Sequence, residues 1–112
     1  MLNDEIFAVS NHRGVREYQP YNDREWTIDI AFPELMLAIE VSGTWHLKDS
    51  RFRADCERNN FLTLAGWTVL VYPASSVKAK ARRRAIAEQI FRRICKVFEP
   101  SLDDDILSQP AR

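Results

Sequence analysis

Two acidic residues, Asp29 and Glu40, occupy neighbouring segments that both have the composition of β-strands. Residues 26–32 and 37–42 are rich in β-branched and aromatic residues, and a proline interrupts the run between them. A tight hairpin centred on residues 34–35 places Asp29 directly opposite Glu40. Opposed residues have Cβ atoms roughly 5 Å apart, so one carboxylate pKa should rise unless a cation lies between the two acids. The spacing therefore predicts a divalent-cation site.

Period-two alternation divides this hairpin into two faces of different character. The first face carries the acids among small side chains: Thr27, Asp29, Ala31, Ala38, Glu40 and Ser42. The second face carries bulky side chains: Trp26, Ile28, Ile30, Phe32, Leu37, Ile39 and Val41. We expect the bulky face, together with Trp67, to enter the core rather than to stack on bases.

The elements that must position these acids follow from periodicity and turn signals. Helices are predicted at residues 2–10, 49–65 and 75–98, and two further strands at 15–21 and 67–72. The first three strands can form an antiparallel meander, and the helix before the last strand makes a crossover. The predicted fold is α/β (α+β): a mixed sheet of about four strands flanked by helices, in the order α-β-β-β-α-β-α.

The bulk properties fit a single domain over residues 1–99, with an acidic, flexible tail at 100–112. The chain has 112 residues and is 46% hydrophobic, which is enough for one modest core. It contains no run of the ~20 apolar residues that span a membrane, and its acidic start does not fit a signal peptide. A soluble, cytoplasmic protein with no membrane partner is expected. Cys56 and Cys95 are isolated, so both are interpreted as buried thiols.

The charges are distributed unevenly although the formal net charge is zero. Residues 78–96 carry eight basic side chains and the single acid Glu88. A basic helix on a neutral protein favours a local anionic partner, and a solvated helix face is the alternative.

Several ordered motifs resemble the PD-(D/E)xK nuclease superfamily, in particular its small domains related to very-short-patch-repair and restriction enzymes. The resemblance covers residues 15–77. It is carried by Asp-Ile-Ala-Phe-Pro at 29–33, Glu-Val-Ser-Gly-Thr-Trp-His at 40–46, Asp-Cys-Glu-Arg at 55–58, Leu62 and Gly-Trp-Thr-Val-Leu at 66–70. None of these motifs is specific alone, but their order is moderately specific.

The resemblance implies a restriction-endonuclease-like fold and metal-dependent hydrolysis of DNA. Asp29 and Glu40 would be ligands of Mg²⁺, with Mn²⁺ as a substitute, together with a backbone carbonyl near Val41. Mg²⁺ suits such a site, because it prefers a few carboxylate oxygens and keeps several waters. Ser42 departs from the pattern, since the superfamily name expects a lysine at this position and the closer relatives often have a third acid there. A charged assistant would then come from His46, Lys48 or Arg58.

Five other residues are each open to two interpretations. His46 could accept a proton or orient a phosphate, or be an ordinary loop histidine. Trp45 could stack on a base or pack over the end of the sheet. Asp55 and Arg58, three residues apart on a helix, form an ion pair, or Arg58 contacts a phosphate. Glu5 could be the acid that relatives carry on the first helix, or a surface acid.

Three functional hypotheses follow. The first is a Mg²⁺-dependent endodeoxyribonuclease whose specificity, including any preference for DNA structure, comes from DNA shape, homodimerisation or a partner protein. Its variant is a Holliday-junction-type resolvase that acts as a dimer. The second is a catalytically weakened DNA-binding module of the same fold, which Ser42 favours. The third is a structural protein whose basic helix binds an acidic partner. The sequence leaves open DNA against RNA and the number of metals.

Overall fold

The computed structural model describes residues 1–43 and 49–98, and these form a four-stranded sheet with helices on both faces. The strands are β1 (Val15–Tyr18), β2 (Ile28–Phe32), β3 (Leu37–Ser42) and β4 (Thr68–Pro73), and a 3-10 turn (Pro33–Leu35) joins β2 to β3. The helices are α1 (Leu2–Ser10), α2 (Asp49–Leu64), α3 (Ala74–Lys78) and α4 (Lys80–Phe98). This confirms the predicted mixed α/β class and element order, with two helices where one was predicted at the end.

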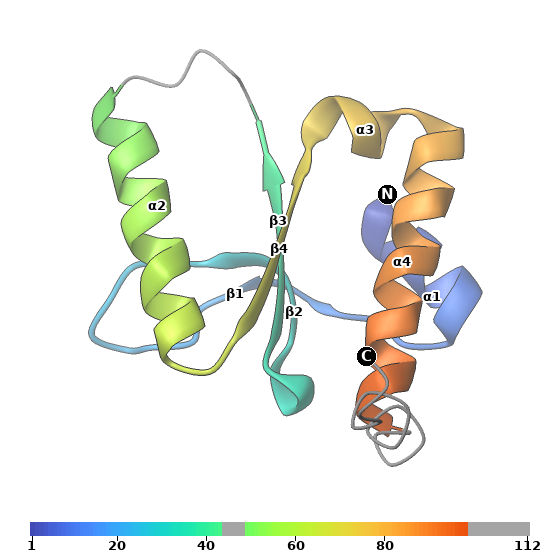
Figure 1. The fold of residues 1–112 in the computed structure, drawn as a ribbon, viewed down its shortest axis with the longest axis horizontal. Coiled ribbons are helices and arrows are strands. Elements are labelled where there is room, and N and C mark those ends of the chain that lie inside the picture. The colour runs from blue at the N-terminus through green and yellow to red at the C-terminus, as the bar shows by residue number, and fades with distance from the viewer. Residues whose placement is uncertain (44–48, 99–112) are drawn as a thin grey trace, which may run out of the picture.

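The sheet has the predicted topology. Its order is β1-β2-β3-β4, with antiparallel pairing from β1 to β3 and parallel pairing of β3 with β4. Figure 1 shows the sheet between α2 on one side and α1 and α4 on the other. Helix α2 is the crossover that returns the chain to the end of the sheet where β3 began, as parallel neighbours require.

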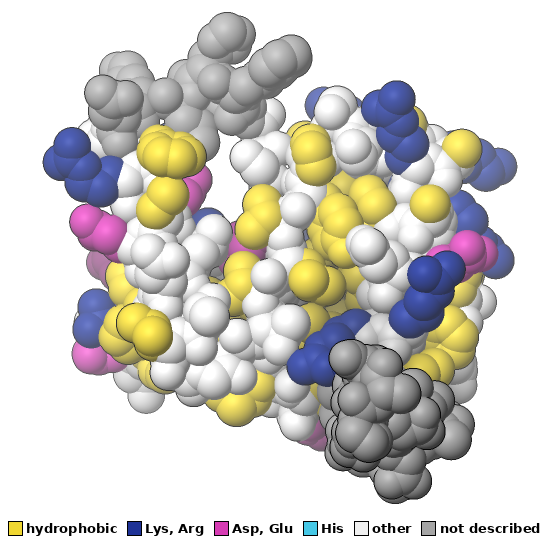
Figure 2. Space-filling view, viewed as in Figure 1, with side chains coloured by type: hydrophobic (Ala, Val, Ile, Leu, Met, Phe, Trp, Pro, Cys, Tyr) yellow, Lys and Arg dark blue, Asp and Glu magenta, His cyan; other side chains and the backbone are white. Residues whose placement is uncertain are grey.

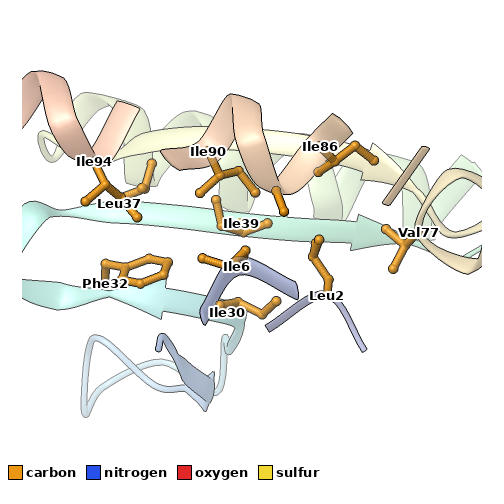
Figure 3. Packing of buried hydrophobic residues seen from close by; sticks show 11 residues of the cluster. Leu2, Ile6, Ile30, Phe32, Leu37, Ile39, Val77, Ile86, Ile90 and Ile94 are labelled. Atoms are coloured by element: carbon orange, nitrogen blue, oxygen red, sulfur yellow. The ribbon is translucent and has the colours of Figure 1, made fainter. Parts of the chain in front are cut away.

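The larger core fills the space between the sheet and helices α1 and α4 (Figure 3). Helix α4 contributes Ile86, Ile90 and Ile94, which are spaced by four residues and therefore form one apolar stripe. Ala87 of α4 also belongs to this core, and the sheet and the other helices contribute the remaining members: Leu2, Ile6, Ile30, Phe32, Leu37, Ile39 and Val77. The predicted core positions on β2 and β3 are confirmed here for the pairs nearest the turn.

A smaller cluster lies under α2 and corrects part of the predicted alternation. It contains Ile28, Ala31, Ala38, Leu62 and Trp67. Ile28 was predicted on the bulky face with Ile30, and Trp26 was predicted there too, but Trp26 contacts Phe61 of α2 with ring centroids 5.2 Å apart. The pairing of β2 with β3 starts only at Ile30 and Ile39. Before this pair β2 is held only by β1, through the pairing of Tyr18 with Ile28, and Trp26 precedes the strand, so the alternation set by the pairing with β3 does not extend to them.

The predicted final helix is divided at Ala79, whose backbone is extended with φ −78° and ψ 119°. Arg83 stabilises the break, because its guanidinium donates to the carbonyl oxygens of Val77 at 3.1 Å and Lys78 at 3.4 Å. Ala79 is exposed and lies outside the apolar stripe of Ile86, Ile90 and Ile94.

Gly14 offers a test of how the loop between α1 and β1 packs against β2. A Cβ at this position would lie 2.5 Å from Ile30 Cγ2 and 3.1 Å from the carbonyl oxygen of Ala31. We expect Gly14→Ala to lower the free energy of unfolding by about 1–3 kcal/mol in urea titrations, because the inserted methyl overpacks the site. Gly43→Ala is the matched control, since nothing lies within 4 Å of its added Cβ. Equal stability of the two variants would contradict this packing.

Other predictions about the chain as a whole are only partly addressed. Within residues 1–43 and 49–98, no helix is both long and apolar enough to cross a membrane. Cys56 and Cys95 are free thiols, and both are half-buried rather than buried as predicted. The predicted tail at 100–112 lies outside the described residues, and the single domain at 1–99 stays a prediction.

Candidate functional site

A cavity of about 380 Å³ lies between α2 and the strands β2, β3 and β4. Figure 2 shows charged side chains in the hollow between α2 and the central strands. The strands contribute Asp29, Glu40, Val41, Ser42, Gly43 and Val71, and α2 contributes Arg51, Phe52, Asp55, Cys56, Arg58 and Asn59.

The hairpin register places the two predicted acids at this cavity. Ile30 pairs with Ile39 and Ala31 with Ala38, as the turn centred on residues 34–35 requires. Asp29 and Glu40 are the next residues on the two strands, and both line the cavity. The small Ala31 and Ala38 beside them let α2 approach this face closely. The predicted juxtaposition is thus confirmed.

Asp29 is held by the backbone of the neighbouring strand. Its Oδ2 accepts a hydrogen bond from the Val41 N–H at 2.7 Å. A side-chain oxygen therefore satisfies a donor of β3 beyond the last paired residues of the two strands, Ile30 and Ile39. This bond fixes the carboxylate at the end of the ladder and leaves its second oxygen for another partner.

Glu40 is buried, with only 4% of its surface exposed, and its two carboxylate oxygens have different surroundings. Oε2 lies 3.5 Å from Arg58 Nη2 on α2, and Arg58 Nη1 lies 3.6 Å from Asp55 Oδ1. Oε1 is buried without a hydrogen-bond partner among the described residues. A buried carboxylate oxygen without a partner is costly, so this atom is the natural place for a proton or a cation.

The pKa of Glu40 reflects this environment. Burial raises it from 4.5 to about 7, Arg58 opposes the rise, and the neighbouring charges of Asp29 and Asp55 add to it. The predicted repulsion between the two acids is real, and in the absence of metal Arg58 offsets only part of it.

The donor set fits a hard divalent cation. Within residues 1–43 and 49–98, no three His, Cys, Asp or Glu side chains gather to hold a metal. The protein could therefore supply the oxygens of Asp29 and Glu40 and a backbone carbonyl such as that of Val41, with water completing the shell. Few carboxylates with several waters is the pattern that Mg²⁺ tolerates.

The remaining predicted site residues have mixed outcomes. Ser42 is exposed and lines the cavity. Trp45, His46 and Lys48 lie outside the described residues. The predicted ion pair between Asp55 and Arg58 is present, and Arg58 also reaches Glu40.

Glu5 does not line this cavity. Its carboxylate lies 3.4 Å from Arg83 Nε and 3.0 Å from Arg84 Nη1, which ties α1 to α4 on the opposite face of the sheet. The hydrogen bond from Arg84 lowers the pKa of Glu5. Glu5 is therefore neither part of this cavity nor a free surface acid, because its side chain is only 17% exposed and pairs with two arginines.

Sequence reasoning missed the side chains of α2 that line the cavity beside Asp55. Phe52, Asp55, Cys56 and Asn59 have the spacing i, i+3, i+4 and i+7, which places them on one helix face. That spacing was a readable signal, because an aromatic residue shares the face with polar side chains. Arg51 also lines the cavity and forms no ion pair with the described residues.

The basic segment lies away from the acids. Helix α4 covers the other face of the sheet from α2 (Figure 1). Part of its charge has local partners, since Arg84 pairs with Glu5 and Glu88, and Arg93 donates to Thr68 Oγ1 at 3.0 Å. An anionic partner on this helix would therefore be separate from a ligand of the cavity.

Comparison with known proteins adds no family to this description. The chain matches no protein-family model, no curated protein and no solved structure. The resemblance to the PD-(D/E)xK superfamily therefore stays a prediction from the motif residues.

Proposed function

We propose that the chain is a metal-dependent endonuclease that hydrolyses phosphodiester bonds of DNA in the cavity under α2. The observation that carries this proposal is the meeting of Asp29 and Glu40 at one cavity, with Glu40 Oε1 buried and without a partner among the described residues. Surface acids would be hydrated, whereas this pair is placed where a cation would relieve both burial and repulsion.

The residues of the chain have separable tasks in such a reaction. The Val41 N–H orients Asp29, and Arg58 orients Glu40 through Oε2, so the remaining oxygens are directed by fixed neighbours. Mg²⁺ held by these oxygens would supply positive charge to the phosphodiester and activate water as the nucleophile. Arg51 is available on the cavity wall to contact a phosphate oxygen.

Arg58 supports the view that a cation from α2 compensates for Ser42. The superfamily pattern has lysine where this chain has serine, and a hydroxyl carries no positive charge. Arg58 brings a guanidinium to 3.5 Å from Glu40 from a different element. Of the three assistants considered from the sequence, Arg58 is the one that lies within the described residues.

The proposal is tested by incubating the protein with supercoiled plasmid, single-stranded DNA, a matched RNA strand and a four-way junction. We expect nicking or cleavage of at least one DNA substrate with Mg²⁺ or Mn²⁺ and none with EDTA. Preference for the junction, with a dimeric elution volume in size-exclusion chromatography, would support the resolvase variant. Cleavage that persists in EDTA would contradict the proposal.

A second candidate is a DNA-binding module without catalysis. The ion pair between Arg58 and Glu40 favours it, because it offsets part of the negative charge of the site without metal. This candidate predicts tight DNA binding with no product on any substrate. The structural-protein hypothesis differs from both, because it predicts no rise in melting temperature with Mn²⁺, whereas a metal site in the folded state must give one.

A further inference from the structure

Two large apolar side chains are exposed at the acidic cavity. Phe52 on α2 is 60% exposed and Val71 on β4 is 51% exposed, and both line this cavity. Figure 2 shows hydrophobic side chains on both sides of the hollow. Exposed apolar groups in the lining of a polar site indicate a ligand with an apolar part.

A second hollow continues from this cavity. It has a volume of about 690 Å³ and shares Ser42, Gly43 and Val71 with the first. From there it runs over Pro73 to Lys78, which is exposed and forms no ion pair with the described residues. The surface thus presents, in sequence, a pair of acids, a section with the apolar side chains of Val71 and Pro73, and the positive charge of Lys78.

We propose that this surface binds an unpaired segment of a DNA strand, with one base stacked on Phe52 and a phosphate of the same strand at Lys78. The inference rests on the proposed nuclease function and specifies its substrate: DNA with unpaired nucleotides beside the scissile phosphate. The alternation of the surface matches a nucleic-acid strand, in which apolar base faces alternate with anionic phosphates.

The requirement for an unpaired base follows from the position of Phe52. Within a duplex both faces of a base are covered by its neighbours, so an aromatic ring on a cavity wall can stack only on a base that has left the helix. Base stacking on an aromatic ring accepts any base, so Phe52 provides structural rather than sequence preference. Lys78 adds a contact that depends on salt.

Binding is measured by fluorescence anisotropy with Ca²⁺ in place of Mg²⁺, on a labelled single strand, a splayed-arm duplex and a blunt duplex. We expect Phe52→Ala to raise Kd about tenfold for the first two ligands and less than about twofold for the blunt duplex. Phe52→Trp should bind like the wild type, whereas Phe52→Leu should bind like Phe52→Ala, because leucine has no π-face. Leu64→Ala is the matched control, since Leu64 lies on the same helix, is 89% exposed and does not line the cavity.

Lys78→Ala should weaken binding of every ligand that occupies the groove and reduce the salt slope by about one. Lys96→Ala, at the far end of α4, is its control. The proposal is overturned if Phe52→Leu binds like the wild type, if Phe52→Ala weakens blunt duplex equally, or if no ligand responds to Phe52. Because binding is read without cleavage, Phe52-dependent binding by an inactive protein would reject only the nuclease function. Cleavage that ignores Phe52 would reject only this inference.

Discussion

Asp29→Asn is expected to reduce metal-dependent DNA cleavage by at least about 10²–10³-fold, the size of effect that follows removal of one preorganised electrostatic group. The substitution keeps the shape of the side chain, and its oxygen can still accept the Val41 N–H that Asp29 Oδ2 accepts at 2.7 Å. The strand end should therefore stay in place while one negative charge at the cavity is lost. Single-turnover cleavage at saturating protein measures the effect on the chemical step without a contribution from product release.

Glu34→Gln is the matched control for this loss of charge. Glu34 belongs to the same hairpin, is exposed, and lies in the turn at the end remote from the cavity. Its replacement should leave cleavage and the Mn²⁺-dependent rise in melting temperature unchanged, whereas Asp29→Asn should abolish that rise. The Asp29 charge also raises the pKa of Glu40, so this pKa should fall in Asp29→Asn. Undiminished cleavage by a folded Asp29→Asn protein would reject the assigned site.

The acids could be predicted from the sequence because hairpin geometry is local. Once the turn is centred between residues 34 and 35, pairing of Ile30 with Ile39 follows, and Asp29 and Glu40 must be neighbours. The character of the face that the acids share could also be recognised from nearby residues, since the small side chains of Ala31 and Ala38 mark where a helix approaches. The same rule failed for Ile28 and Trp26, because it presumes pairing of β2 with β3, and that pairing ends at Ile30.

What could not be predicted depends on how separate elements meet. The contact of Arg58 with Glu40 requires a particular rotation of α2 over the sheet, and helix spacing alone gave only the pair of Arg58 with Asp55. The break at Ala79 depends likewise on Arg83 reaching back to carbonyl groups of α3. The missing lysine at Ser42 could be noticed in the sequence, but the position of a compensating cation is a tertiary property.

The second large effect is a fall in the stability of the metal-free protein as pH rises. Glu40 has a pKa of 4.5 when solvated and about 7 when folded, so the folded state binds a proton more tightly than the unfolded state. Stability is therefore highest below pH 4.5, falls between pH 4.5 and 7, and levels off above pH 7 as far as this group is concerned. The shift corresponds to about 3 kcal/mol of unfolding free energy. Urea titrations in EDTA from pH 4 to 8.5 measure it.

Glu40→Gln and Arg58→Met identify the groups behind this dependence. Glu40→Gln should remove the slope, because glutamine does not titrate. Arg58→Met removes the cation that opposes the rise, so the pKa of Glu40 should move further up. The fall in stability would then continue above pH 7, by about 1.4 kcal/mol for each further pH unit until the new pKa is reached. The double variant should lose this extension if the two side chains are coupled as their 3.5 Å contact indicates. If the unfolding free energy of Glu40→Gln still falls with pH, the titrating group lies elsewhere. Added Mg²⁺ should flatten the pH dependence of the wild-type protein only if it binds the ionised Glu40.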